Sequence, residues 1–195
     1  KPIRKARVYA TGLGIYELYL NGEKIGDEYL APGFHSYDFW QQYQTYDVTE
    51  ALQAGGNAIG FMLGDGWFKG RFGFDGGYED LYGDQFRLIA ECIVTYEDGT
   101  EEIIASDDTW EVAEGPLVSS SIYDGEVYDA NLEIDGWNKY SESESAVCWE
   151  RMQLSDTDTE ELQARLSVPV KIVDAFVPEL IITPAGEQVL DFKQN

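Results

Sequence analysis

Carboxylates and aromatic rings alternate at one point of the sequence, where Asp124, Glu126 and Asp129 are interleaved with Tyr123 and Tyr128. Paired carboxylates can cleave a glycosidic bond when the two groups stand roughly 5–9 Å apart and one has a raised pKa. A solvated strand edge shows the same alternation, however, and the chain carries 37 acidic residues in all. We therefore expect no autonomous hydrolase and assign no catalytic residue.

The other residues with reactive side chains are few. His35, the only histidine, lies between Phe34 and Ser36, and no Gly-x-Ser-x-Gly motif accompanies it. We expect a loop histidine packed against aromatic neighbours. Cys92 and Cys148 are far apart in sequence and form neither a zinc-binding spacing nor a disulfide framework, so we expect two free thiols.

The segment 64–84 combines many glycines with carboxylates. Calcium takes about six to eight oxygen ligands from carboxylates, carbonyls and amides, and this segment contains such groups. Its acidic residues Asp75, Glu79, Asp80 and Asp84 lack the spacing of an EF-hand. No motif requires a cofactor, and calcium binding is left open.

The same segment contains the aromatic residues Trp67, Phe68, Tyr78 and Tyr82. Aromatic rings beside polar groups are typical of sugar-binding sites, because a pyranose has an apolar face and several hydroxyls. The alternative is that these rings pack beneath the loop as a small satellite core. The sequence alone does not separate the two interpretations for any single ring.

Composition excludes several classes of partner. The net charge is −24, so a phosphate backbone would be repelled and nucleic acid is not expected as a partner. No apolar run approaches the roughly 18 residues of a membrane span, so no membrane insertion is expected. Because the chain begins at Lys1 without Met, a signal sequence could have been removed and localisation is not assigned.

Most of the elements that must position these candidate residues are predicted to be β-strands. Short runs rich in β-branched and aromatic residues recur with turn residues between them, and they predict strands at 7–10, 15–20, 42–48, 58–63, 86–96, 102–105 and 109–113. Asn21-Gly22 predicts a tight hairpin turn, and Thr49–Ala54 predicts a short helical turn. The segment 64–84 is expected to be a long loop. We predict an all-β protein, a jelly-roll-like antiparallel β-sandwich.

Three regions follow from changes in composition. Residues 1–137 are expected to form the β-sandwich. Residues 138–166 are polar and acidic and are expected to be a connector, with a short helix at Glu161–Leu166. Residues 167–195 are again strand-like and are expected to form a partial second β element.

Several short motifs, in this order, resemble the N-terminal domain of bacterial α-L-rhamnosidases of glycoside hydrolase family 78. They are Leu18-Tyr19-Leu20-Asn21-Gly22, Leu30-Ala31-Pro32-Gly33, Tyr43-Gln44-Thr45-Tyr46-Asp47-Val48-Thr49, Asn57-Ala58-Ile59-Gly60, Gly64-Asp65-Gly66-Trp67-Phe68-Lys69-Gly70-Arg71, Tyr82-Gly83-Asp84 and Ile122-Tyr123-Asp124-Gly125-Glu126-Val127-Tyr128-Asp129-Ala130. The tail 189–195 resembles the start of the family's next β-domain, with Lys193 in place of the usual glycine.

The resemblance implies a fragment of a hydrolase that carries no active site of its own. In that family, terminal α-L-rhamnosides are hydrolysed with inversion in a downstream (α/α)6 barrel. Some relatives of the domain resemble carbohydrate-binding modules that hold L-rhamnose through calcium. By this resemblance the candidate sugar-binding residues are Asp65, Trp67, Asp84, Tyr123, Asp124 and Glu126, and the candidate metal ligands are Asp84 and Asp124.

Three functions are therefore open. The domain could bind rhamnose-containing carbohydrate, or it could be a structural domain that packs on its own catalytic domain and binds no ligand. A protein-interaction sandwich is the third. A concave pocket with polar and aromatic walls would favour the first, and a contiguous exposed apolar surface would favour the second.

Overall fold

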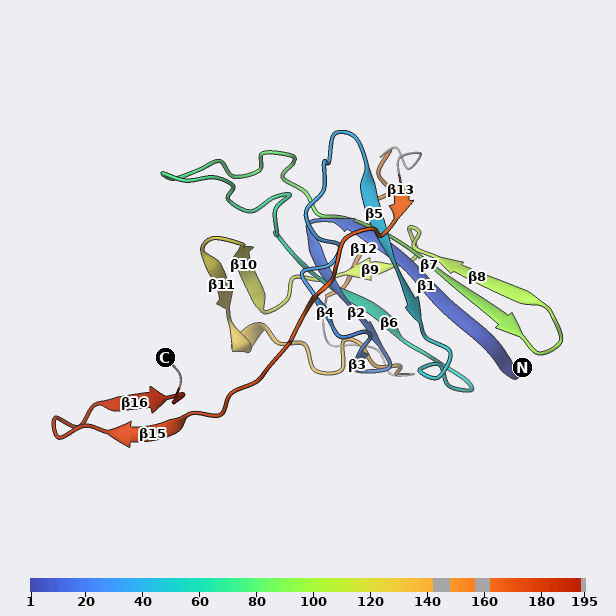
Figure 1. Ribbon diagram of the computed structural model, residues 1–195. Coiled ribbons are helices and arrows are strands. Elements are labelled where there is room, and N and C mark those ends of the chain that lie inside the picture. Colours follow the sequence, from blue (N-terminus) through green and yellow to red (C-terminus); the bar gives the residue numbers. More distant parts are fainter. Residues whose placement is uncertain (142–147, 157–161, 194–195) are drawn as a thin grey trace.

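The computed structural model describes residues 1–141, 148–156 and 162–193, and nearly all regular structure in them is β-strand (Figure 1). The all-β prediction is confirmed. The strands are β1 Ile3–Leu13, β2 Ile15–Leu20, β3 Glu23–Lys24, β4 Glu28–Tyr29, β5 Gln41–Asp47, β6 Ile59–Gly64, β7 Arg87–Tyr96, β8 Glu101–Ala105, β9 Glu111–Val112, β10 Leu117–Ser121, β11 Gly125–Tyr128, β12 Glu150–Arg151, β13 Leu162–Ala164, β14 Val170–Lys171, β15 Glu179–Ile182 and β16 Gln188–Asp191. A short 3-10 helix, η1, spans Ala130–Leu132.

The largest sheet has the strand order β13-β5-β1-β7-β8. Its central strand, β1, pairs antiparallel with both β5 and β7. Apolar side chains alternate with exposed ones along β7, where Ala90, Cys92 and Val94 are buried, because successive residues of a strand face opposite sides of the sheet. The strand predicted at 86–96 is confirmed, although Phe86 lies just before it and is exposed.

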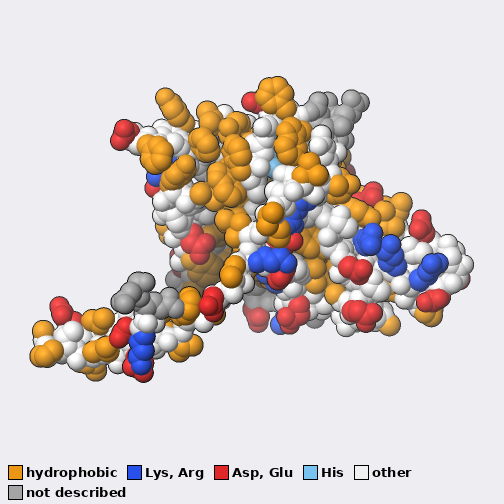
Figure 2. Space-filling view, viewed as in Figure 1, with side chains coloured by type: hydrophobic (Ala, Val, Ile, Leu, Met, Phe, Trp, Pro, Cys, Tyr) orange, Lys and Arg blue, Asp and Glu red, His pale blue; other side chains and the backbone are white. Residues whose placement is uncertain are grey.

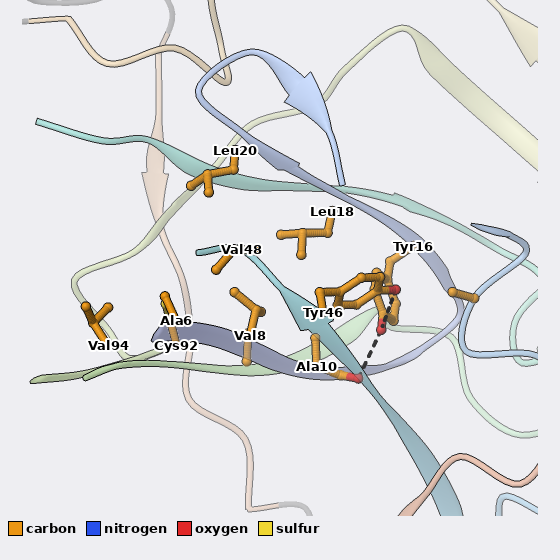
Figure 3. Close-up of a cluster of buried hydrophobic side chains, with 12 residues drawn as sticks. Ala6, Val8, Ala10, Tyr16, Leu18, Leu20, Tyr46, Val48, Cys92 and Val94 are labelled. Carbon is orange, nitrogen blue, oxygen red and sulfur yellow. Dashed lines mark hydrogen bonds between the residues drawn. The ribbon is translucent and has the colours of Figure 1, made fainter. Parts of the chain in front are cut away.

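A second sheet, β3-β2-β6, supplies the other half of the core. Buried side chains from both sheets form one apolar cluster, which includes Val8 of β1 and Leu18 of β2 (Figure 3). Within it the Tyr16 hydroxyl has two acceptors in reach of its one proton, the Ala10 carbonyl at 3.0 Å and Gln44 Oε1 at 2.8 Å. The buried hydroxyl therefore has acceptors, as a buried polar group requires.

The turn between β2 and β3 matches the expected hairpin. Asn21 and Gly22 have φ angles of 53° and 93°, the positive values that a type I′ turn needs. The predicted turn after β5 also forms, because the amides of Ala51 and Leu52 both donate to the Val48 carbonyl. The predicted strand at 109–113 is reduced to β9.

The predicted helix at Glu161–Leu166 is wrong over its described part. Glu161 lies outside the described residues, and Leu162–Ala164 form β13, which pairs in parallel with β5. Just beyond it, the amides of Leu166 and Ser167 donate to Gln42 Oε1 at 2.7 and 3.0 Å. Helix propensity is a weak preference that tertiary contacts override. Here residues 162–164 pair with the edge of β5 instead of forming a helix.

The C-terminal part of the chain joins the sandwich and then leaves it. β12 pairs with β9 and β14 pairs with β4, so strands on both sides of residue 166 bond to earlier ones. β15 pairs only with β16 among the described residues, in a hairpin that extends away from the sandwich (Figure 1). Residues 194–195 of the tail motif are outside the described residues. The division at residues 137 and 166 stays a prediction.

No helix in the described ranges combines the length and apolar character needed to cross a bilayer.

Candidate functional site

A pocket opens beside the first turn of the loop that follows β6. Its volume is about 220 Å³, below the roughly 300–1,000 Å³ of pockets for drug-sized ligands, so it has room for about one sugar ring. We call it the Tyr37 pocket. It is lined by Leu13, Tyr37, Asp38, Gln41, Phe68, Tyr82, Gly83, Asp84, Gln85 and Arg87.

Three aromatic rings hold the pocket's shape. The Tyr37 ring packs on Phe68 with centroids 5.2 Å apart and on Tyr82 at 4.9 Å. Burial raises the pKa of Tyr37, so its hydroxyl keeps its proton at neutral pH. A side chain at Gly83 would place its Cβ 2.6 Å from the Phe68 ring. Glycine at that position therefore lets the loop approach Phe68 closely.

Polar groups complete the wall. Asp38 and Asp84 contribute carboxylates, and Gln41 and Gln85 contribute amides. Carboxylates accept hydrogen bonds from hydroxyls, and amides both accept and donate. Together with the rings, these groups can bind a small polyhydroxylated molecule.

His35 packs against Tyr37, a residue of the pocket wall. It is 1% exposed, and its ring lies against Tyr37 and Trp40 with centroids 5.5 and 6.2 Å away. Its Nε2 accepts a hydrogen bond from the Gln42 amide at 3.3 Å. Burial lowers the pKa of His35 to about 4, so the ring is neutral at pH 7. The prediction of a loop histidine packed against aromatic neighbours is confirmed.

Asp65 connects the loop after β6 to the β10–β11 hairpin. The Ser120 amide donates to Asp65 Oδ2 at 3.0 Å, and the Asp65 amide donates to Ser120 Oγ at 2.7 Å. Lys69 Nζ lies 3.3 Å from Asp65 Oδ1. The carboxylate of Asp65 is thus engaged by the protein itself, which is a structural role.

Tyr123 and Asp124 at the tip of the same hairpin are held by one arginine. Arg71 donates from Nε and Nη2 to the two carboxylate oxygens of Asp124, at 2.7 and 2.8 Å. Its guanidinium also lies 5.1 Å from the centre of the Tyr123 ring. The hydrogen bond from Arg71 lowers the pKa of Asp124. Both oxygens of Asp124 are occupied by this bidentate pair.

A smaller hollow lies beside Gly66 and Ser120. Its volume is about 130 Å³, and its walls come from β2, the loop after β6 and the β10–β11 hairpin. The residues that line it are Ile15, Leu30, Gly66, Ser120, Ser121, Ile122, Gly125 and Glu126. It is mostly apolar and offers few groups for a polar ligand.

Comparison with known proteins places the chain in a family. The model of the α-L-rhamnosidase N-terminal domain matches residues 1–174. The chain belongs to this family.

Relatives of this α-L-rhamnosidase N-terminal domain are full-length enzymes. An α-L-rhamnosidase of Streptomyces avermitilis is 39% identical over 197 residues, which cover 100% of this chain and 19% of the relative. An α-L-rhamnosidase of Formosa agariphila is 35% identical over 201 residues, with 21% of its length covered. The domain thus spans about a fifth of the length of these relatives.

Solved structures agree with this assignment. The native α-L-rhamnosidase from Aspergillus terreus superposes with a TM-score of 0.90 at 39% identity, over 100% of this chain and 22% of that one. The Streptomyces avermitilis α-L-rhamnosidase complexed with L-rhamnose gives a TM-score of 0.88 at 39% identity, over 100% and 19% of the two chains.

The rhamnosidase domain divides the predicted site residues between two places. Tyr123, Asp124 and Glu126 belong to the β10–β11 hairpin, to which Asp65 is bonded, whereas Asp84 lines the Tyr37 pocket. Within the hairpin Asp124 is paired with Arg71 and Glu126 lines the smaller hollow. Trp67 is partly buried, with its ring 6.3 Å from that of Phe34. No group of three or more histidine, cysteine or acidic side chains that could hold a metal occurs in the described part of the chain.

Most residues of the Tyr37 pocket were not predicted from the sequence. Tyr37 and Asp38 come from the stretch between β4 and β5, which has no periodic pattern, and Gln41 is the first residue of β5, so nothing in the sequence placed them near Asp84. The one available signal was an aromatic residue next to an acidic one just before a strand. Cys92 and Cys148 are both free, as expected.

Proposed function

We propose that this domain is a non-catalytic accessory domain of an α-L-rhamnosidase and that it binds rhamnose-containing carbohydrate in the Tyr37 pocket. The observation that supports this is the pocket itself, in which carboxylates and amides stand beside three aromatic rings. Aromatic rings cover the apolar face of a pyranose and the polar groups bond its hydroxyls. A neutral sugar also suits a chain with a net charge of −24.

The parent enzyme supplies the chemistry in this proposal. A downstream (α/α)6 barrel hydrolyses terminal α-L-rhamnosides with inversion, using its own carboxylates. The domain's task is to hold the glycan near that barrel, which raises its effective concentration there.

Calcium is part of the proposal as an optional ligand of the same pocket. Asp38 and Asp84 both line it, and they would supply carboxylate oxygens, with sugar hydroxyls and water completing the shell of about six to eight. Asp124, the other expected ligand, is held by Arg71 instead. The ion, when bound, would fix the orientation of the sugar's hydroxyls.

A second function is favoured by the C-terminal segment 166–192. Its apolar side chains are exposed to an extent unusual for a folded domain, with Val168 at 90%, Val173 at 96% and Val177 at 93%. Exposed apolar surfaces of this kind mark interaction sites. We propose that the segment packs on the rest of the enzyme, so that the domain also supports its own catalytic domain structurally. The two roles use different surfaces.

Titration of the chain with L-rhamnose, with and without calcium, tests the binding function. Protein NMR is suitable because a single sugar gives about 4 kcal/mol and hence a millimolar Kd. We expect saturable shifts around Tyr37 and Asp84 that D-glucose does not reproduce. Asp84→Asn should weaken the affinity at least fivefold, whereas the control Glu126→Gln, in the smaller hollow, should leave it unchanged.

The outcomes separate the two functions. Spectra that stay flat up to about 50 mM L-rhamnose would reject carbohydrate binding and leave the structural role. An equal loss in both variants would move the site away from the Tyr37 pocket.

A further inference from the structure

A continuous row of aromatic rings leads from the Tyr37 pocket onto the surface. Tyr37 lies edge-on to Phe34 at 6.0 Å, Phe34 stacks on Phe72 at 5.9 Å, and Phe72 lies edge-on to Tyr123 at 6.5 Å. The Phe74 ring follows at 6.1 Å from Tyr123. We call the surface rings Phe34, Phe72, Tyr123 and Phe74 the aromatic track. They come from three loops far apart in sequence.

The outer rings of the track are exposed to solvent. Phe74 is 86% exposed, Phe34 is 47% exposed and Tyr123 is 44% exposed. Figure 2 shows hydrophobic side chains gathered on the upper part of the visible face, over the loops of this end of the sandwich. A contiguous exposed apolar patch on a domain indicates a binding surface.

Hydrogen bonds hold the loop and the hairpin that carry Phe72, Phe74 and Tyr123. Arg71 donates to Asp124 and to the Gly73 carbonyl, and its guanidinium faces the Tyr123 ring. The backbones of Phe72 and Tyr78 exchange two hydrogen bonds, at 2.8 and 2.9 Å, around the turn that presents Phe74. Side chains already fixed in place lose less conformational entropy when a ligand binds.

We propose that the aromatic track binds the sugar residues that follow the one in the Tyr37 pocket, so that the domain recognises a rhamnose-terminated oligosaccharide rather than a single sugar. This proposal rests on the function proposed above. The track begins at Tyr37, which is itself a pocket residue. Phe34 and Phe72 stack on each other and Arg71 faces the Tyr123 ring, so the ring with the most surface available to an apolar sugar face is Phe74, which is 86% exposed.

A neutral, extended ligand fits the surroundings better than a protein partner. The loop beside the track carries Asp75, Glu79 and Asp80, which can accept hydrogen bonds from sugar hydroxyls. The exposed apolar side chains of segment 166–192 already provide a separate surface for the rest of the enzyme. The aromatic track is thus the surface continuous with the pocket.

The test compares L-rhamnose with a trisaccharide that ends in α-L-rhamnose, by calorimetry or NMR on the same chain. We expect the trisaccharide to bind on the order of tenfold more tightly, as one or two well-covered rings would provide. Phe74→Ala should reduce that advantage to about twofold or less. It should retain the wild-type affinity for L-rhamnose.

The control is Phe176→Ala, which removes a half-exposed phenylalanine from the C-terminal segment and should keep the full advantage. Because Phe74 is almost fully exposed, its replacement leaves the core intact, and circular dichroism checks the fold. Equal affinities for L-rhamnose and the trisaccharide would overturn the proposed role of the aromatic track and leave the proposed function of the Tyr37 pocket standing. Absence of binding to both ligands would reject the proposed function and the track together.

Discussion

His35 makes the stability of the domain depend on pH. Its pKa is about 4 in the folded chain because the ring is buried, against about 6.5 in an unfolded one. The unfolded chain therefore binds a proton first as the pH falls. Stability from the neutral ring is complete above about pH 6.5 and is lost progressively down to about pH 4, by up to about 3 kcal/mol.

Urea unfolding at several pH values measures this effect. The His35→Gln variant retains an acceptor for the Gln42 amide but does not titrate, so its stability should fall less between pH 7 and pH 4. The carboxylates titrate in both proteins and cancel in the comparison. Parallel pH profiles for the two proteins would show that His35 is not the group responsible.

At the scale of single residues, the sequence predicted environments better than it predicted partners. We predicted a loop histidine packed against aromatic neighbours, and His35 is buried against Tyr37 and Trp40. The motif residues Asp84 and Asp124 gave no hint that they would lie in different places, because that depends on which loops the sheets bring together. Arg71, which occupies the Asp124 carboxylate, lies 53 positions away in the chain.

Gln42 connects β5 to the strand that joins the sheet last. Its side chain is 2% exposed, and its Oε1 accepts from the amides of Leu166 and Ser167. Gln42→Ala leaves both donors without this acceptor and should lower the free energy of unfolding by about 2 kcal/mol. Faster hydrogen exchange at residues 162–167 should accompany the loss, while the exposed-site control Gln53→Ala should show neither change.

The turn between β2 and β3 gives a second prediction about an element. Gly22→Ala should cost about 1 kcal/mol because alanine is strained at a φ of 93°. The new Cβ would also lie 2.8 Å from Lys139 Cε, the end of a flexible side chain that can move. The matched variant Gly99→Ala, at a φ of 79° with open space around it, should cost nearly the same. A several-fold larger cost at Gly22 would mean that Lys139 is fixed.

Elements with a period-two pattern were predicted well, and the one short helix was not. Apolar and polar residues alternate along β7 because only one face of this strand is buried, and this alternation is visible in the sequence. The segment at 162–166 contains good helix formers, yet it completes a sheet, because the unpaired β5 edge is a property of the assembled fold. The residues of the segment itself therefore do not indicate that it will pair with this edge.

In the molecule as a whole, the C-terminal hairpin should contribute little to the free energy of unfolding of the sandwich. β15 and β16 pair with each other and their side chains are largely exposed. Deleting residues 175–195 should change the thermal midpoint by less than about 2 °C and should reduce binding of an apolar dye. A comparison deletion from Leu162 onward removes β13 and β14 and should lower the midpoint by more than about 5 °C. Equal effects would show that the hairpin stabilises the sandwich.

The parallel pairing of β13 with β5 also orders events while the chain is being made. Gln42 and Leu166, which its side chain binds, are separated by 124 positions. At roughly 5–20 residues per second, a ribosome needs on the order of 10 s to make that stretch. Throughout this time the nascent chain exposes an unpaired strand edge, which is a template for pairing with other chains. Neighbouring copies on one messenger RNA are therefore most prone to associate before Leu162 emerges.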